Sequence, residues 1–129
     1  MRAQLNVTDY IGKQQFLSII KSSDASVVAV FVAKWCGFCR MFVDLARSVD
    51  FRASEGRGED QSNKKPVYLI DADSDDGSLW DEYKIAIVPT ILVFRGDKVV
   101  FRQDGRSMVG LVKGDLERAM DAARSSDAR

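Results

Sequence analysis

Residues 34–41 read K-W-C-G-F-C-R-M and contain both cysteines of the chain, Cys36 and Cys39. An apolar run, V-V-A-V-F-V-A at residues 27–33, comes directly before this stretch, and apolar residues at helical spacing follow it. A short, continuous run rich in β-branched residues is typical of a strand covered on both faces. The sequence therefore places the two cysteines where a central strand ends and a helix begins.

The two cysteines are suited to thiol–disulfide exchange. Cys36 falls at or just before the start of the helix, where unpaired backbone N–H groups and the positive end of the helix dipole favour a thiolate. Cys39 follows on the same side of the helix, within reach of a disulfide with Cys36. One sulfur can attack a substrate disulfide and the other can resolve the product, so we predict a redox-active dithiol.

Two other interpretations of the cysteine pair are weaker. Buried, inert cysteines are common, but seldom as a C-x-x-C pair at a strand-to-helix junction. A zinc site needs about four ligands, whereas the chain contains two cysteines and no histidine. We therefore expect no metal, and no cofactor other than the Cys36–Cys39 disulfide itself.

The length and charge of the chain limit its organisation and partners. Its 129 residues suit a single domain over residues 1–129. Lys+Arg and Asp+Glu each total 19, so there is no basic excess to bind nucleic acid. No segment approaches the roughly 20 apolar residues that a membrane span needs, and residues 1–10 lack the apolar stretch of a signal peptide. We expect a cytoplasmic monomer that binds neither nucleic acid nor membranes.

Four helices are expected from apolar residues at helical spacing. The first spans residues 9–22, with Thr8 and Asp9 as N-cap candidates. The second follows the cysteines, a short third lies around residues 79–83, and the fourth ends the chain. The apolar face of the second consists of Phe38, Phe42, Leu45 and Val49, and that of the fourth of Leu116, Ala119, Met120 and Ala123.

Strand signals alternate with these helices. P-V-Y-L-I at residues 66–70 follows a polar surface loop at residues 52–65 and precedes a solvated acidic turn, D-A-D-S-D-D-G. I-L-V-F at residues 91–94 and K-V-V-F at residues 98–101 flank R-G-D, which indicates a hairpin. Alternating strands and helices followed by a hairpin predict an α/β domain, with a central mixed β-sheet and helices on both faces.

Four stretches of the chain resemble motifs of the thioredoxin family. W-C-G-F-C-R is similar to the W-C-x-x-C active site of that family, and I-V-P-T-I-L-V-F to its proline-bearing strand. G-D-K-V-V-F then matches the hairpin, and L-V-K-G-D-L the start of the last helix. The likeness covers roughly residues 9–123. It implies a thioredoxin fold and a thiol–disulfide oxidoreductase that acts on protein disulfides, with a thioredoxin reductase or another electron donor as a partner.

The resemblance also implies roles for individual residues. Cys36 would be the nucleophile and Cys39 the resolving cysteine. The Val88–Pro89 peptide bond would be cis and would face the dithiol, which leaves the Val88 backbone able to pair with an extended substrate. An ordinary trans proline at the start of a strand is the alternative.

The residues beside the cysteines are candidates for substrate binding. Trp35 either fills the core or shapes the docking surface, and its place directly before Cys36 favours the second. Family reductases often carry Gly-Pro between the cysteines, whereas this chain has Gly37 and Phe38. The Phe38 ring is either exposed, where it would grip a partner, or packed on the helix.

One departure from the family bears on the reaction. Thioredoxins usually carry a buried Asp six residues before the first cysteine, often paired with a Lys on the next strand, and these residues move a proton to and from the second thiol. Here the positions hold Val30 and Leu69. General-base help is worth about 10²–10⁴-fold, so its loss should slow release of the mixed disulfide.

Three functions are therefore considered. The first is a specialised reductase with a restricted set of partners. The second is a binding or chaperone module of the same fold with little redox turnover, which fold alone does not distinguish. The third, a disulfide oxidase or isomerase, would require an oxidising compartment.

Overall fold

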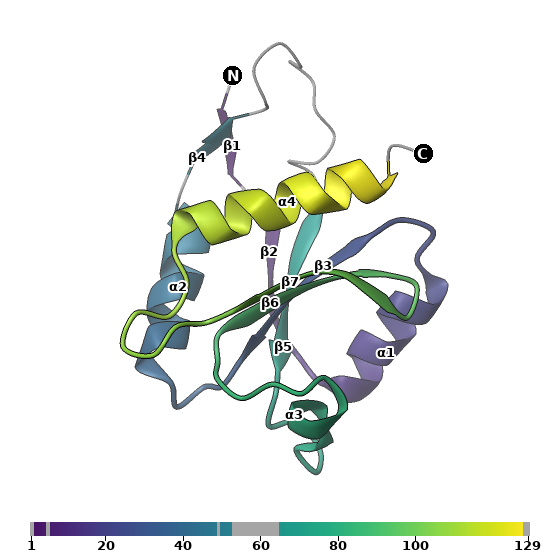
Figure 1. Cartoon of the computed structure of the whole chain (residues 1–129), viewed down its shortest axis with the longest axis vertical. Helices are drawn as coiled ribbons and strands as arrows, with labels where there is room; N and C mark the ends of the chain where they lie inside the picture. The colour runs from purple at the N-terminus through teal and green to yellow at the C-terminus, as the bar shows by residue number, and fades with distance from the viewer. Residues whose placement is uncertain (1, 5, 49, 53–64, 128–129) are drawn as a thin grey trace.

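The computed structural model describes residues 2–4, 6–48, 50–52 and 65–127 (Figure 1). Its elements follow one another in the order β1 (Arg2–Gln4), β2 (Asn6–Ile11), α1 (Lys13–Ser22), β3 (Val27–Val32), α2 (Gly37–Ser48), β4 (Asp50–Arg52), β5 (Pro66–Asp71), α3 (Ser78–Glu82), β6 (Thr90–Arg95), β7 (Lys98–Asp104) and α4 (Lys113–Asp127).

Five strands form one mixed sheet in the order β2-β5-β3-β6-β7. β2, β5 and β3 run parallel, whereas β6 is antiparallel to β3 and β7 is antiparallel to β6. Every residue of β3 is buried, as expected for a central strand covered on both faces. β1 and β4 pair with each other in a separate antiparallel ladder. The α/β class and the mixed sheet predicted from the sequence are confirmed.

Helices cover both faces of the sheet. Figure 1 shows α1 and α3 on one side and α4 on the other, and α2 contacts α4. Phe16 of α1 packs edge-to-face against Phe31 of β3 and Phe94 of β6, with ring centroids 5.4 and 5.3 Å apart. Tyr83, which follows α3, contacts the same three rings. These aromatic contacts fix β3 against α1. They therefore also fix the end of β3, after which the cysteines follow.

The predicted start of the first helix was wrong, because residues 6–11 form a strand. Thr8 and Asp9 lie within β2, and α1 begins only at Lys13. Thr8 Oγ1 accepts a hydrogen bond from Leu69 N of β5 at 3.1 Å, so its side chain joins two strands instead of capping a helix. β2 is an edge strand with a bulge in its pairing to β5. That bulge interrupts the alternation of apolar and polar residues by which a strand is recognised in a sequence.

The later elements lie close to their predicted positions. The strand at residues 66–70 is part of β5, the short helix around residues 79–83 is α3, and the hairpin is β6–β7. All the residues predicted for the apolar face of α4 are buried, namely Leu116, Ala119, Met120 and Ala123.

The buried face of α2 differs from the predicted one. Phe42 is buried as expected, but Cys39 and Val43 are also buried, whereas Phe38 and Leu45 are only partly buried. The helix is therefore rotated so that Cys39 points into the core. Val49 and most of the predicted loop, residues 53–64, lie outside the described residues.

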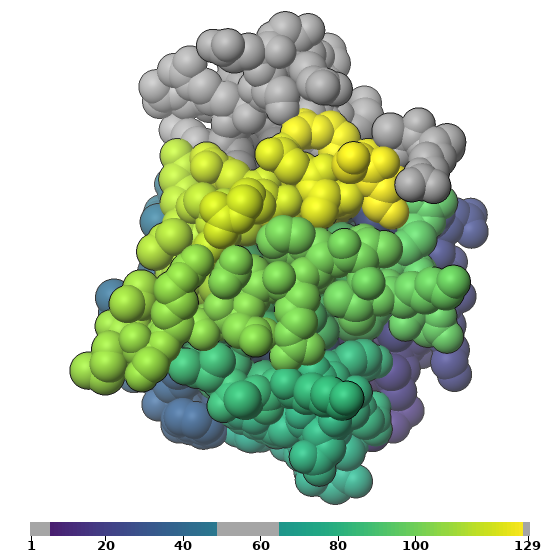
Figure 2. Space-filling model, in the orientation of Figure 1, coloured from purple at the N-terminus to yellow at the C-terminus, as the bar shows by residue number. Residues whose placement is uncertain are grey.

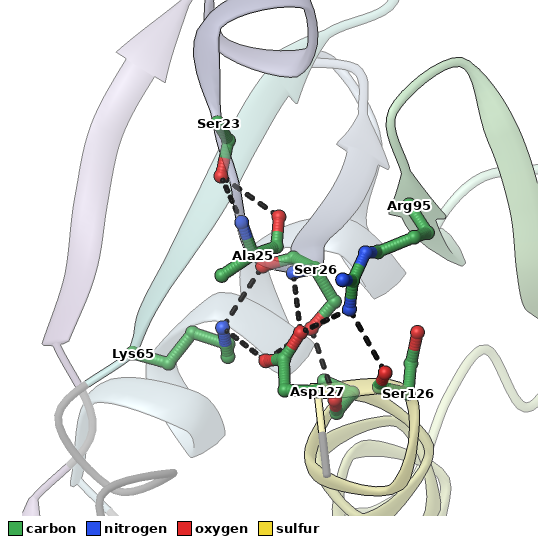
Figure 3. Close-up of polar contacts among 8 residues, drawn as sticks. Ser23, Ala25, Ser26, Lys65, Arg95, Ser126 and Asp127 are labelled. Carbon is green, nitrogen blue, oxygen red and sulfur yellow. Dashed lines mark hydrogen bonds and ion pairs between the residues drawn. The ribbon is translucent and has the colours of Figure 1, made fainter. Parts of the chain in front are cut away.

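A half-buried polar cluster ties the end of α4 to the residue before β3 (Figure 3). Asp127 accepts hydrogen bonds from Ser26 N at 2.8 Å and from Ser26 Oγ at 2.9 Å, and it pairs with Lys65 at 2.9 Å and Arg95 at 3.0 Å. Burial alone would raise the pKa of Asp127, but the Ser26 N–H and the Lys65 ammonium outweigh burial and hold that pKa below its usual value. These partners offset the unfavourable placement of a negative charge at a helix C-terminus.

Replacing Asp127 by Asn would remove the charge from this cluster while keeping its shape. We expect the free energy of unfolding to fall by about 1–3 kcal/mol, because Lys65 and Arg95 lose their shared partner. Urea unfolding at neutral pH measures this change. Asp121→Asn is the control, because Asp121 is exposed and pairs with Arg124 on the surface of the same helix. Equal losses in the two variants would contradict a stabilising role for the cluster.

Candidate active site

The cysteines lie at the junction between β3 and α2, as predicted. β3 ends at Val32 and α2 begins at Gly37, directly after Cys36. Cys36 N donates to Ala33 O at 3.1 Å, which closes a turn after the strand, and Arg40 N donates to Cys36 O at 3.2 Å, as in the first turn of a helix. Cys36 is therefore the N-cap residue of α2.

The sulfur of Cys36 takes the place of an N-cap side chain. Cys39 N donates to Cys36 Sγ at 3.3 Å, the contact that a Ser or Asp side chain makes with the third residue of a helix. The sulfur thus accepts one of the N–H groups that the first turn of a helix leaves without a backbone partner. Cys36 is 8% exposed, so its sulfur lies just beneath the surface.

Cys39 is more deeply buried and chemically different. It is 1% exposed, and its sulfur accepts a long hydrogen bond from Ala33 N at 3.5 Å. Burial raises the pKa of the Cys39 thiol to about 12, and the Ala33 N–H offsets this effect only in part. Both cysteines are free thiols in the structure. The site therefore combines a sulfur near the surface with a protonated, protected thiol one helical turn away.

The segment before β6 faces the sulfur of Cys36. The Val88–Pro89 peptide bond is cis, as the resemblance implies. Cys36 Sγ donates to Val88 O at 3.6 Å, which brings residues far apart in the sequence together. Sequence reasoning missed Gly105, which lies against this segment. A Cβ at that position would come within 2.4 Å of Pro89 O, so only glycine fits there.

Trp35 lies at the surface beside the dithiol rather than in the core. It is 67% exposed, and its Nε1 donates to Asp73 Oδ2 at 2.7 Å. Trp80 Nε1 donates to the other oxygen, Asp73 Oδ1, at 2.9 Å. Asp73 thus holds the exposed ring in a defined orientation. The sequence predicted only a solvated acidic turn at this position, because no local pattern connects Asp73 with a tryptophan 38 residues away.

The two residues between the cysteines have different environments. Gly37 is exposed, whereas Phe38 is half-buried and packs against the core. One neighbour of Phe38 is Gly110, where an added Cβ would lie 3.2 Å from Phe38 Cβ. Gly110 also has a positive φ of 78°, a conformation that favours glycine. Phe38 therefore packs on its surroundings, as in the second of the two predicted alternatives, while part of it stays accessible.

Val30 and Leu69 lie in the hydrophobic core, on neighbouring strands of the sheet. They are Cα partners in the pairing of β3 with β5, and both are buried. In the described part of the chain the buried carboxylate is Asp115, which is bound by Arg106 and Arg118. The two positions at which the family carries its acid–base pair are thus paired across β3 and β5 and hold apolar residues.

Within the described residues, no three His, Cys, Asp or Glu side chains are grouped in a way that could hold a metal ion. Among the same residues, no helix is long and apolar enough to cross a membrane.

Comparison with solved structures gives the class of protein. The chain matches thioredoxin F from spinach chloroplast (long form) with a TM-score of 0.66 and 24% identity, over 92% of this chain and 87% of that one. It matches a chain in the crystal structure of a complex of ferredoxin:thioredoxin reductase and thioredoxin f2 with a TM-score of 0.66 and 27% identity, over 92% and 96% of the two chains. The class is that of proteins with the thioredoxin fold.

Comparison of sequences gives the family. Residues 7–121 match the family model described as Thioredoxin. Thioredoxin 1 of Nostoc sp. is 32% identical over 101 residues, which are 78% of this chain and 81% of that protein. The chloroplastic F-type thioredoxin of Pisum sativum is 29% identical over 118 residues; the match takes in 90% of this chain but only 57% of the pea protein. The chain belongs to the thioredoxin family, whose members are disulfide oxidoreductases.

Single-cysteine variants should differ in their reactivity toward iodoacetamide. We expect Cys39 in a Cys36→Ser variant to react about 10²-fold more slowly at pH 7 than Cys36 in a Cys39→Ser variant, because Cys39 is buried and protonated. Mass spectrometry of quenched samples measures both rates. Similar rates at pH 7 would contradict the difference between the two sulfurs.

Proposed function

We propose that the chain reduces protein disulfides through Cys36 and Cys39. The observation that supports this proposal most directly is the contact between Cys39 N and Cys36 Sγ at the start of α2. It favours a nucleophilic sulfur at Cys36, while Cys39 stays protonated and out of reach of solvent until it is needed.

The proposed reaction has two exchange steps. The Cys36 thiolate attacks one sulfur of the substrate disulfide, so that a mixed disulfide forms and the other substrate sulfur leaves as a thiolate. Cys39 then loses its proton and attacks Cys36 Sγ, which forms the Cys36–Cys39 disulfide and releases the second substrate thiolate. Two electrons pass from the protein to the substrate, and an external thiol donor must return them.

The second step is expected to be the slow one. Burial raises the pKa of the Cys39 thiol to about 12, and Val30 and Leu69, which occupy the positions of the family's acid–base pair, carry no group that could accept a proton. Deprotonation then depends on hydroxide or on a group of the bound substrate. This supports a specialised reductase that acts on a restricted set of partners.

Substrate docking would use the surface around the dithiol. Trp35 and Gly37 are exposed there, and part of Phe38 is accessible. Val88 and Pro89 are buried next to Cys36, with the Val88 carbonyl facing the sulfur. An extended protein segment that carries a disulfide could lie between these two groups.

The electron donor belongs to the same proposal. The comparison structure named above is a complex of ferredoxin:thioredoxin reductase with thioredoxin f2. We expect a thioredoxin reductase or another dithiol donor to serve this chain. Its cytoplasmic location, its monomeric state and its organisation as one domain stay predictions from the sequence.

Insulin reduction with dithiothreitol as the donor tests the proposed activity. We expect turnover by the natural chain and at least about a 10²-fold loss in Cys36→Ser, because the attacking sulfur is gone. Reduced Cys39→Ser, mixed with insulin after dithiothreitol has been removed, should instead accumulate the mixed disulfide, which mass spectrometry detects. Turnover at the uncatalysed rate by the natural chain would favour the alternative, a binding or chaperone module.

The pH dependence of resolution tests the missing acid–base pair. Reduced protein mixed with 5,5′-dithiobis(2-nitrobenzoate) should release one thionitrobenzoate as Cys36 is captured and a second as Cys39 resolves the adduct. Because burial holds the pKa of Cys39 well above this pH range, its thiolate fraction grows about tenfold per pH unit, and the rate of the second release should rise accordingly between pH 7 and 9. A second phase that is independent of pH would contradict this account. Cys39→Ser should show the first phase alone.

A further inference from the structure

Arg102, on the edge strand β7, binds the backbone at the end of α3. Its Nη1 donates to Tyr83 O at 2.6 Å, and its Nη2 donates to Lys84 O at 2.8 Å. Its Nε donates to Asp104 Oδ1 at 2.7 Å, and Asp104 lies two residues further along, on the same face of the strand. Figure 2 shows α3 at the bottom of the molecule and the brighter green of the β6–β7 hairpin above it, on the same face. Arg102 therefore connects the edge of the sheet with the end of a helix.

The end of α3 has a backbone conformation that favours glycine, yet the residue there is Lys84. Ile85 N donates to Trp80 O at 2.8 Å and Lys84 N donates to Asp81 O at 3.2 Å, which are the two bonds that close a helix through a left-handed residue. Lys84 is that residue, with a φ of 52°. Its Cβ makes this conformation unfavourable, whereas glycine adopts it freely. Contacts from outside the helix can therefore contribute to holding this bend.

The two carbonyl groups that Arg102 binds lie on either side of the bend. Tyr83 O belongs to the peptide group before the Cα atom of Lys84, and Lys84 O belongs to the peptide group after it. Because each peptide group is planar, the relative orientation of these two groups is set by φ and ψ of Lys84 alone. A guanidinium presents its N–H groups in a fixed planar fork. By binding both carbonyls with one fork, Arg102 restricts both dihedral angles of Lys84 together.

The segment that follows the bend leads to Cys36. Val88 is buried, and its carbonyl oxygen faces Cys36 Sγ at 3.6 Å. Only residues 85–87 separate Val88 from Lys84. A change of φ or ψ at one residue redirects the chain that follows it, because the peptide groups themselves are rigid. The direction in which the chain leaves Lys84 therefore affects where the Val88 backbone lies relative to the sulfur.

We propose that Arg102 is a positioning residue for the disulfide exchange: its guanidinium holds Lys84 in the left-handed conformation, and this bend places the Val88 backbone beside Cys36. The inference rests on the proposed reductase function and adds a residue to it. The three bonds of Arg102 go to Tyr83, Lys84 and Asp104, so its effect on the site passes through the backbone of residues 83–88. Capture of a small disulfide needs only the sulfur of Cys36 and does not depend on this effect.

Arg102→Gln tests the role in the reaction. We expect KM for insulin to rise about fivefold with kcat changed less than about twofold, because the Val88 backbone is less well placed to pair with an extended substrate. The rate of the first thionitrobenzoate release should stay within about twofold of that of the natural chain. Arg102→Lys keeps the charge but not the fork, so it should resemble Arg102→Gln. Circular dichroism checks that the variants fold.

Lys98→Gln is the matched control, because it removes an exposed cation from the same strand. It should leave KM, kcat and the first thionitrobenzoate release at their natural values. An unchanged KM in either Arg102 variant, or an equal rise in Lys98→Gln, would overturn the inference.

Second substitutions at Lys84 test whether Arg102 acts through the bend. In the Arg102→Gln background, Lys84→Gly should return KM for insulin to within about twofold of the natural value, because glycine adopts the left-handed conformation without support. Lys84→Ala removes the same charged side chain but keeps Cβ, so it should give no recovery. Equal recovery with alanine, or no recovery with glycine, would overturn the inference.

Amide hydrogen exchange measured by NMR observes the bend without a substrate. The Ile85 N–H, which donates to Trp80 O, should exchange about fivefold faster in Arg102→Gln than in the natural chain, because the helix end opens more often. Equal exchange in the two proteins would overturn the inference. If the natural chain does not reduce insulin, the proposed function fails, and the role of Arg102 in the reaction fails with it. Failure of the inference alone is recognised by an active natural chain whose KM is matched by Arg102→Gln.

Discussion

The hydrogen bond from Cys39 N to Cys36 Sγ depends on where α2 begins, and the rest of the site is arranged around it. A helix exposes unpaired N–H groups in its first turn, and a sulfur at the N-cap receives one of them. The sulfur can occupy this place because β3 ends at Val32 and a turn closed by Cys36 N and Ala33 O follows. The central strand, which packs against Phe16 and its aromatic partners, thus sets the position of Cys36.

The same arrangement gives the two sulfurs different environments. α2 turns Cys39 toward the core, so that burial keeps this thiol protonated, while Cys36 stays near the surface against the Val88 carbonyl. In the interior, Val30 and Leu69 contribute packing and no proton acceptor. In the proposed reaction, the apolar core that stabilises the sheet would also limit how fast the buried thiol can lose its proton.

The parts that sequence reasoning predicted are those encoded within a few neighbouring residues. The run before Lys34 is continuously apolar and the helix after Cys39 is periodic, so the dithiol junction follows from local pattern. β2 was missed because an edge strand with a bulge has no clear alternation. Asp73, Gly105, Gly110 and the Arg106–Asp115 pair were missed for a different reason. Each acts on a partner brought to it by the fold, and nothing in its own sequence neighbourhood identifies that partner.

The carboxylate of Asp73 is shared by Trp35 and Trp80, which are the two tryptophans of the chain. All indole emission from this protein therefore originates in one hydrogen-bonded cluster beside the dithiol. Fluorescence excited at the indole band reports the local environment of that cluster and is silent about distant regions such as the end of α4. A change in tryptophan fluorescence during a redox cycle can thus be assigned to the surroundings of Asp73 without labelling the protein.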